Sequence, residues 1–88
     1  MKLRIDRSFE KDTDKLQDAK LLLKIANCIE QIIKAPTKEE ILNLKKLKGF
    51  KQHYRIRIGD YRIGAIILDD EIILERFIHR REIYKYYP

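Results

Sequence analysis

Three arginines are concentrated in the segment HYRIRIGDYRIG, residues 53–64, where they alternate with aliphatic and aromatic residues. Arg55 and Arg57 precede a Gly-Asp pair, and Arg62 follows it. A guanidinium group is planar, permanently charged and rich in N–H donors, which suits it to bind two oxygens of a phosphate group. Several guanidinium groups in one place would bind a phosphodiester and stabilise additional negative charge on it.

The elements that flank the Gly-Asp pair determine whether these arginines converge. Alternation with a period of two predicts two β-strands, and Gly59–Asp60 between them is typical of a two-residue hairpin turn. Such a turn places Arg57 opposite Arg62 and Arg55 opposite Gly64, so the three arginines should share one face of the sheet. Two like charges directly across a strand pair destabilise a fold. We therefore interpret the arginine face as an anion site.

The neighbouring positions offer both functional and structural interpretations. Gly64 should leave an open floor beside the arginines. The pair Asp69–Asp70 predicts a second turn, which would continue the register so that the arginine face also carries Ile73, Glu75, Phe77 and His79. Glu75 could simply neutralise an arginine. Phe77 could stack on a nucleotide base or cap the core, and His79 could share in proton transfer or be an ordinary surface residue.

The net positive charge is concentrated in the second half of the chain. The 88 residues carry a formal net charge of +6, with a pI of about 9.5. Within residues 45–62 the one acidic residue is Asp60. This excess favours an anionic partner such as RNA, although surface charge can also serve solubility alone. In the basic segment KKLKGFKQ, which we interpret as a loop, we expect Lys46 and Lys48 to bind RNA.

Other reactive residue types are scarce. Cys28 is the only cysteine, which favours a reducing cytoplasm, and its place in a helical pattern indicates a small core residue. Two histidines and one cysteine make no zinc pattern, and no nucleotide-binding glycine motif occurs, so we expect no metal and no cofactor. No apolar run approaches the ~18 residues of a membrane span, and the N-terminus does not resemble a signal peptide. We expect a cytoplasmic protein without membrane association.

The whole pattern predicts a single α+β domain over residues 1–88. KLRID alternates as a strand, and the segment Asp14 to Lys34 has a helical period, either as one long helix or as a helical hairpin kinked near Gln17. Thr37 and Glu40 predict a capping box that begins a further short helix. We expect a mainly antiparallel sheet with two N-terminal helices packed on one face and a short C-terminal helix, in the order β-α-α-β-β-β-α.

Taken together, these segments resemble the RelE/ParE superfamily of bacterial and archaeal toxins. The resemblance covers nearly the whole chain and is most specific in YRIRIGDYRI and HRREIY, with support from LKKLKGF and SFEKDTDKL. It implies the toxin of a type II toxin–antitoxin system, inhibited by a cognate antitoxin. Members of the RelE branch are endoribonucleases that cleave mRNA in the ribosomal acceptor site. They use no metal: the ribose 2′-hydroxyl attacks the adjacent phosphate and leaves a 2′,3′-cyclic phosphate.

The resemblance also implies roles for individual residues. The catalytic positions of the family fall on Arg62, Arg80 and Tyr84, and its basic strand positions fall on Arg55 and Arg57. In-line attack on a phosphate needs a base, an acid and positive charge around the phosphorane, and this set of residues suits that chemistry.

Two of these assignments have alternatives. The HRR sequence leaves open whether Arg80 or Arg81 takes the catalytic place, and Tyr86 or Tyr87 could substitute for Tyr84. The residues that we expect to bind RNA are Lys46, Lys48, Arg55, Arg57, Phe77, His79 and Arg81.

Two other functions fit the same fold. The first is a ParE-like inhibitor of DNA gyrase, which acts by binding and needs no catalysis. The second is an RNA-binding module that has kept only the basic face. Arg62, Arg80 and Tyr84 favour the nuclease, because a gyrase inhibitor needs no such set of residues.

Overall fold

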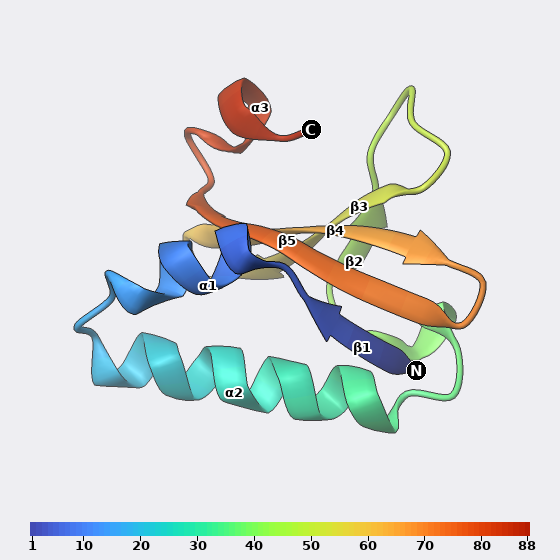
Figure 1. Ribbon diagram of the computed structural model, residues 1–88, viewed down its shortest axis with the longest axis horizontal. Coiled ribbons are helices and arrows are strands. Elements are labelled where there is room, and N and C mark those ends of the chain that lie inside the picture. The colour runs from blue at the N-terminus through green and yellow to red at the C-terminus, as the bar shows by residue number, and fades with distance from the viewer.

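The computed structural model describes residues 1–88 and is built on one five-stranded sheet (Figure 1). Its strands are β1 (Lys2–Ile5), β2 (Leu44–Lys46), β3 (His53–Ile58), β4 (Tyr61–Leu68) and β5 (Glu71–His79). They lie in the order β1-β5-β4-β3-β2, with β1 parallel to β5 and every other pair antiparallel. The α+β class and the mainly antiparallel sheet are confirmed.

Helices lie on both faces of this sheet. The N-terminal helices α1 (Arg7–Asp14) and α2 (Ala19–Lys34) cover one face, and the short α3 (Ile83–Tyr86) lies on the other (Figure 1). Of the two expected arrangements for the N-terminal region, the helical hairpin is correct, but its first helix begins at Arg7 and ends at Asp14, where the predicted helical segment was to begin. A carboxylate oxygen of Asp18 accepts a hydrogen bond from the Leu21 N–H at 3.1 Å, which starts α2 after the break. None of the helices is both long enough and apolar enough to cross a membrane.

The capping box at Thr37 is not formed. The segment makes a single 3₁₀ turn, η1 (Lys38–Glu40), and the Thr37 side chain makes no capping hydrogen bond. Instead, the side-chain amide of Gln31 in α2 donates to the Glu40 carbonyl at 2.7 Å and accepts from the Leu42 N–H at 3.2 Å. Gln31 therefore holds the end of η1. The Glu40 N–H, which a capping box would have bonded to the Thr37 hydroxyl, donates to the Thr37 carbonyl at 3.1 Å instead.

The basic segment after η1 also differs from its interpretation as a loop. Residues 44–46 form the edge strand β2, in which Lys45 pairs with Arg55 and Lys46 with Tyr54. Lysines are common on edge strands because their charge discourages pairing with other chains. The loop is confined to the residues between β2 and β3.

Two hydrophobic clusters hold the layers together. The main core lies between the sheet and the N-terminal helices, and its fully buried members include Ile32 of α2 and Ile63 of β4. Cys28 packs against this core as expected, and burial raises the pKa of its thiol to about 11. A smaller cluster on the other face joins α3 to the sheet; it consists of Leu47, Ile78, Ile83 and Tyr87.

The hairpin register of β3 and β4 is the one that the sequence predicts, but the register of β4 and β5 is not. Ala65 pairs with Leu74 and Gly64 with Arg76, so Glu75 is an extra residue in a β-bulge. An extra residue reverses the face of every residue beyond it. The prediction that Phe77 and His79 lie on the arginine face is therefore wrong: they oppose Ile63 and Tyr61 on the helical face.

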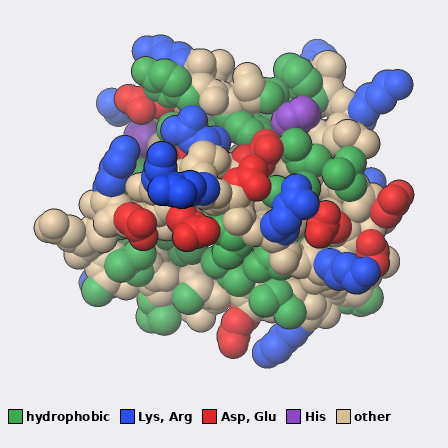
Figure 2. Space-filling model, in the orientation of Figure 1, with side chains coloured by type: hydrophobic (Ala, Val, Ile, Leu, Met, Phe, Trp, Pro, Cys, Tyr) green, Lys and Arg blue, Asp and Glu red, His purple; other side chains and the backbone are tan.

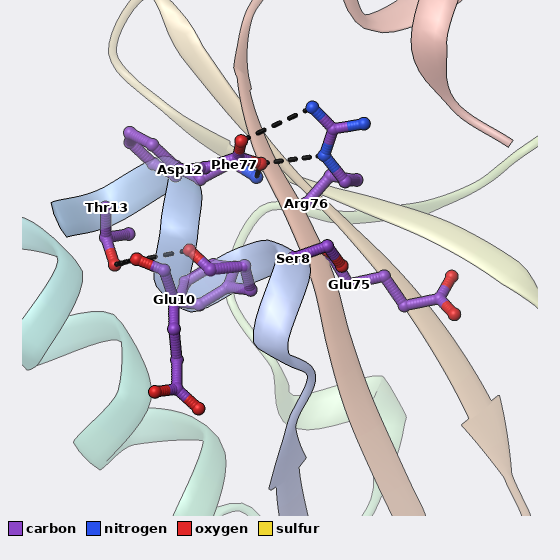
Figure 3. Close-up of polar contacts among 8 residues, drawn as sticks. Ser8, Glu10, Asp12, Thr13, Glu75, Arg76 and Phe77 are labelled. Atoms are coloured by element: carbon purple, nitrogen blue, oxygen red, sulfur yellow. Dashed lines mark hydrogen bonds and ion pairs between the residues drawn. The ribbon is translucent and has the colours of Figure 1, made fainter. Parts of the chain in front are cut away.

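Helix α1 fastens the bulged segment (Figure 3). The Ser8 hydroxyl donates to the Glu75 carbonyl at 2.6 Å. One carboxylate oxygen of Asp12 accepts from Arg76 Nε at 2.8 Å and from the Phe77 N–H at 2.9 Å. These contacts satisfy the backbone at the irregularity and hold the end of β5, from which the HRR sequence leads into α3.

Candidate active site

The arginines of the hairpin lie together, as predicted. Arg57 pairs with Arg62 and Arg55 with Gly64, on the face of the sheet that α1 and α2 leave uncovered. Lys45, opposite Arg55 in β2, shares this face. The two-residue turn and the pleat of the strands are enough to bring these cations together, because opposed residues in an antiparallel pair point the same way.

Two adjoining hollows open on this face, and we refer to them together as the arginine cleft. The first has a volume of about 360 Å³ and is lined by Asn43, Leu44, Lys45, Arg55, Arg57 and Arg62. The second has a volume of about 400 Å³ and is lined by Arg55, Arg62, Arg80, Arg81, Ile83 and Tyr84. Arg55 and Arg62 line both hollows, and no acidic side chain lines either one.

Arg62 is the most constrained cation of the cleft. One of its terminal nitrogens donates to the carbonyls of Gly59 and Tyr61, both at 2.9 Å, so its side chain is held against the hairpin turn. Partial burial lowers the pKa of Arg62, and repulsion from the neighbouring arginines lowers it further. Arginine nevertheless stays charged in proteins. Repulsion of this kind would be relieved by a bound anion.

Arg80 directly follows β5 and is held beside the cleft by the turn between β3 and β4. Its backbone N–H donates to the Asp60 carbonyl at 2.8 Å, and its Nε lies 3.7 Å from a carboxylate oxygen of Asp60. Both side chains are largely exposed, so this ion pair is weak. Arg81 lines the same hollow. Both arginines of the HRR sequence thus line the arginine cleft, and the assignment of the catalytic role to Arg80 stays a prediction.

Of the three C-terminal tyrosines, Tyr84 is the one that lines the arginine cleft. It is 71% exposed, and its hydroxyl accepts a hydrogen bond from the Arg55 guanidinium. Tyr86 lines a different hollow, beside His79 on the helical side of the sheet. Tyr87 is buried, which raises the pKa of its phenol, as does the hydrogen bond that it donates to Glu75.

The expected open floor at Gly64 is filled. A Cβ atom at Gly64 would lie only 2.7 Å from atoms of the Tyr87 ring, so this ring covers the glycine. The Tyr87 hydroxyl donates to a carboxylate oxygen of Glu75 at 2.8 Å. Glu75 therefore does not neutralise Arg55 or Arg57, which was the structural alternative for this face.

Phe77 and His79 lie away from the arginine cleft. Phe77 is 4% exposed and stacks on Tyr61 with ring centroids 4.9 Å apart, so it caps the core and cannot stack on a base at the cleft. His79 packs against the edge of Tyr61, and its Nδ1 accepts a hydrogen bond from the Arg81 N–H. The bulge at Glu75 accounts for both placements.

The two lysines that the sequence analysis expected to bind RNA, Lys46 and Lys48, lie outside the arginine cleft. Lys46 opposes Tyr54 and so points to the helical face, and Lys48 is exposed after β2 without lining either hollow. Lys45, which the sequence analysis did not single out, takes their place. The signal that would have identified Lys45 is the pairing of β2 with β3. No group of three or more His, Cys, Asp or Glu side chains is placed to hold a metal ion.

Comparison with known proteins gives a consistent result. Residues 3–84 match the family model described as "ParE toxin of type II toxin-antitoxin system, parDE". The chain is 51% identical over 47 residues to Toxin RelE3 of Methanocaldococcus jannaschii, an alignment that covers 53% of each protein. It is 42% identical over 62 residues to Putative toxin RelE1 of the same organism, with 69% of each covered. The chain thus aligns with about half the length of RelE3.

Solved structures share the whole fold. A chain of the RelB–RelE antitoxin–toxin complex from Methanococcus jannaschii superposes with a TM-score of 0.81 at 34% identity, covering 97% of this chain and 99% of that one. A chain of the archaeal RelE–RelB complex from Pyrococcus horikoshii OT3 superposes with a TM-score of 0.72 at 22% identity, over 90% of this chain and 93% of that one. The second likeness concerns the fold alone.

Proposed function

Because the chain belongs to the RelE/ParE superfamily of toxins of type II toxin–antitoxin systems, we propose that it is a ribosome-dependent endoribonuclease that cleaves mRNA. The observation that carries this proposal is the arginine cleft: a hollow face without acidic side chains, in which a single tyrosine meets several guanidinium groups. The ribose 2′-hydroxyl attacks the adjacent phosphorus, the bond to the 5′-oxygen breaks, and the products carry a 2′,3′-cyclic phosphate and a 5′-hydroxyl.

Arg57 and Arg62 supply the charge that this reaction needs. In the phosphorane transition state, negative charge increases on the non-bridging oxygens, and donors that are already in place stabilise it without reorganisation. Arg62 is held by two carbonyl groups and is partly buried, so it is the better preorganised of the two. The mutual repulsion of these guanidinium groups makes an anion between them favourable.

Tyr84 is the group that takes the proton from the attacking 2′-hydroxyl, and water supplies the proton that the leaving 5′-oxygen needs. The other ionisable residues that line its hollow are arginines, which do not release a proton in proteins. The hydrogen bond from Arg55 holds the Tyr84 hydroxyl within the cationic cluster. Arg80 is held only weakly by Asp60 and can turn from this carboxylate to the phosphate on the leaving side.

A cognate antitoxin is the proposed protein partner. Solved relatives are complexes named for RelB and RelE, an antitoxin and a toxin. The cationic cleft suits an acidic amphipathic segment that would compete with RNA. Action on translating ribosomes would place the protein in the cytoplasm.

The proposal is tested with purified protein, ribosomes and an mRNA that places a defined codon in the acceptor site. We expect cleavage within that codon and a 2′,3′-cyclic phosphate on the upstream fragment. An mRNA with 2′-deoxyribose at the cleaved nucleotide should stay intact, because the attacking hydroxyl is missing. If the protein leaves both messages intact and inhibits the supercoiling activity of DNA gyrase, the ParE-like alternative is correct instead.

A further inference from the structure

Tyr87 joins the C-terminal segment to the sheet beside the arginine cleft. Tyr87 is 6% exposed, and its ring covers Gly64 so closely that a Cβ atom there would lie 2.7–2.8 Å from three ring atoms. Glycine is thus required at position 64 for this contact, rather than for an unusual backbone angle. The ring occupies the place that a side chain of β4 would otherwise fill.

The hydroxyl group of Tyr87 makes a second attachment. It donates to a Glu75 carboxylate oxygen at 2.8 Å, and Glu75 is the residue that the β-bulge leaves out of the β4–β5 ladder. Glu75 is itself held through its backbone carbonyl, which accepts from the Ser8 hydroxyl of α1 at 2.6 Å (Figure 3). A ring contact and a hydrogen bond therefore hold Tyr87 in position and orientation.

The geometry of α3 transmits this attachment to Tyr84. The helix has four residues, too few to be stable by its own hydrogen bonds. Ile83 and Tyr87 are four residues apart and both belong to the small hydrophobic cluster on the sheet. Successive residues of a helix are rotated by about 100° around its axis. Tyr84 therefore points away from the cluster that Ile83 joins, and it lines the arginine cleft.

We propose that Tyr87 is a positioning residue for Tyr84. By fixing the distance of α3 from the sheet and its rotation about its own axis, Tyr87 places the Tyr84 hydroxyl where it accepts a hydrogen bond from Arg55. The expected effect on cleavage rests on the proposed function, whereas the expected effect on the placement of Tyr84 does not. The competing explanation is that Tyr87 only covers apolar surface and contributes to stability. In that case its removal would lower stability but would not act on the reaction through Tyr84.

Two substitutions displace the ring by independent routes, Tyr87→Ala and Gly64→Ala. Tyr87→Phe keeps the ring and removes only the bond to Glu75, so it should restore most of what Tyr87→Ala loses. Tyr86→Ala is the matched control, since this neighbouring tyrosine lines the opposite hollow. Circular dichroism and thermal unfolding establish that each variant is folded at the assay temperature.

The first measurement is NMR of tyrosine-labelled protein together with amide hydrogen exchange. In Tyr87→Ala and Gly64→Ala we expect shifted Tyr84 ring resonances and faster exchange in residues 83–86, with neither change in Tyr86→Ala. Unchanged Tyr84 resonances in folded variants would overturn the inference, whatever the protein does to RNA.

The second measurement is single-turnover cleavage, with affinity determined on the uncleavable 2′-deoxy message. A displaced catalytic group typically costs on the order of 10²-fold in rate, while affinity should stay near the wild-type value because the arginines are retained. In a Tyr84→Phe background, Tyr87→Ala should cost little more. Additive rate losses would show that Tyr87 does not act through Tyr84. A wild-type protein without cleavage would refute the proposed function, and the NMR result alone would then decide the inference.

Discussion

Arg57 and Arg62 stem from directly opposed positions of β3 and β4, and no acidic side chain lines the hollow that they share. Glu75 accepts a hydrogen bond from Tyr87, and Asp60 makes its ion pair with Arg80 at the turn, so neither carboxylate pairs with Arg57 or Arg62. Like charges in this arrangement contribute nothing to folding. Their proximity is therefore best explained by a ligand that carries negative charge.

Replacing Arg62 should separate activity from stability. We expect Arg62→Ala to abolish cleavage and cellular toxicity, because it removes the best held cation of the cleft. Relief of repulsion offsets the lost hydrogen bonds to two carbonyls. The free energy of unfolding should change by no more than about 0.5 kcal/mol. Arg4→Ala, at an exposed position of β1, removes the same charge outside the cleft and serves as the control. A variant with full toxicity and a clearly lower melting midpoint would show that Arg62 is structural.

Tyr84 and Arg80 should affect the chemical step more than binding. Loss of one oriented acid or base typically lowers a rate by about 10²–10⁴-fold. We expect Tyr84→Phe and Arg80→Ala to bind programmed ribosomes and to cleave the mRNA far more slowly. Single-turnover rates and ribosome pelleting measure the two effects separately. Arg81→Ala is the comparison variant, because Arg81 lines the same hollow as Arg80. A larger loss of cleavage rate in Arg81→Ala than in Arg80→Ala would assign the catalytic role to Arg81.

The two neighbouring lysines of β2 should differ in their effect on RNA binding. Lys45 lines the arginine cleft, whereas Lys46 points to the helical face. We expect Lys45→Ala to weaken RNA binding and to lower the dependence of log affinity on log salt by about one counterion. Lys46→Ala should have the smaller effect on both. RNA affinity of the two variants is measured over a series of salt concentrations. Equal effects of the two substitutions would contradict the prediction that RNA binds to the face on which the strand register places Lys45.

The proposed antitoxin should cover the arginines directly. We expect an acidic segment of the partner to lie against Arg55, Arg57 or Arg80, so that neutralisation and RNA binding exclude each other. Competition between labelled RNA and the antitoxin measures this, and a charge-reversed antitoxin should lose most of its inhibition. A neutralised complex in which the partner contacts only α1 and α2, with the arginine cleft open, would be evidence against direct blocking.

The exposed side of α2 provides the comparison surface for that experiment. Hydrophobic side chains lie at the surface along the lower edge of the molecule, where α2 runs (Figure 2). The exposed apolar residues of α2 are Leu22, Leu23 and Ile33. Leu23→Ser tests whether α2 contributes affinity, and retained neutralisation by this variant would leave the arginine cleft as the principal contact.

Cys28 should make stability fall at high pH. Burial raises the pKa of this thiol from its ordinary value of 9.0 to about 11. Below pH 9 the thiol is protonated in the folded and unfolded chains alike, so its contribution is fully present there. Between pH 9 and 11 the unfolded chain releases the proton and the folded chain keeps it, so stability falls as pH rises, by at most ~1.4 kcal/mol per pH unit. Urea unfolding across this range should be less pH-dependent in Cys28→Ala, and identical slopes would refute burial of the thiol.

Local sequence determined the central feature of the site. A two-residue turn and strict alternation on both sides fix how β3 and β4 pair, so the common face of Arg55, Arg57 and Arg62 followed without knowledge of the rest of the fold. The helical period and the charge pattern predicted α2 in the same way, but they left open whether one helix or two occupy the N-terminal region. Each of these features depends on residues that are close in the chain.

Tertiary structure alone decided the features that depend on distant residues. The bulge at Glu75 is stabilised by contacts from α1, and no local pattern shows that one residue of β5 will be skipped. Its consequence, a reversed face, removed Phe77 and His79 from the predicted site. The contact between Tyr87 and Gly64 likewise joins residues 23 positions apart and distinguishes Tyr84 from the other C-terminal tyrosines. Packing between distant segments depends on how several elements fill space together, and a short-range sequence pattern carries no information about that.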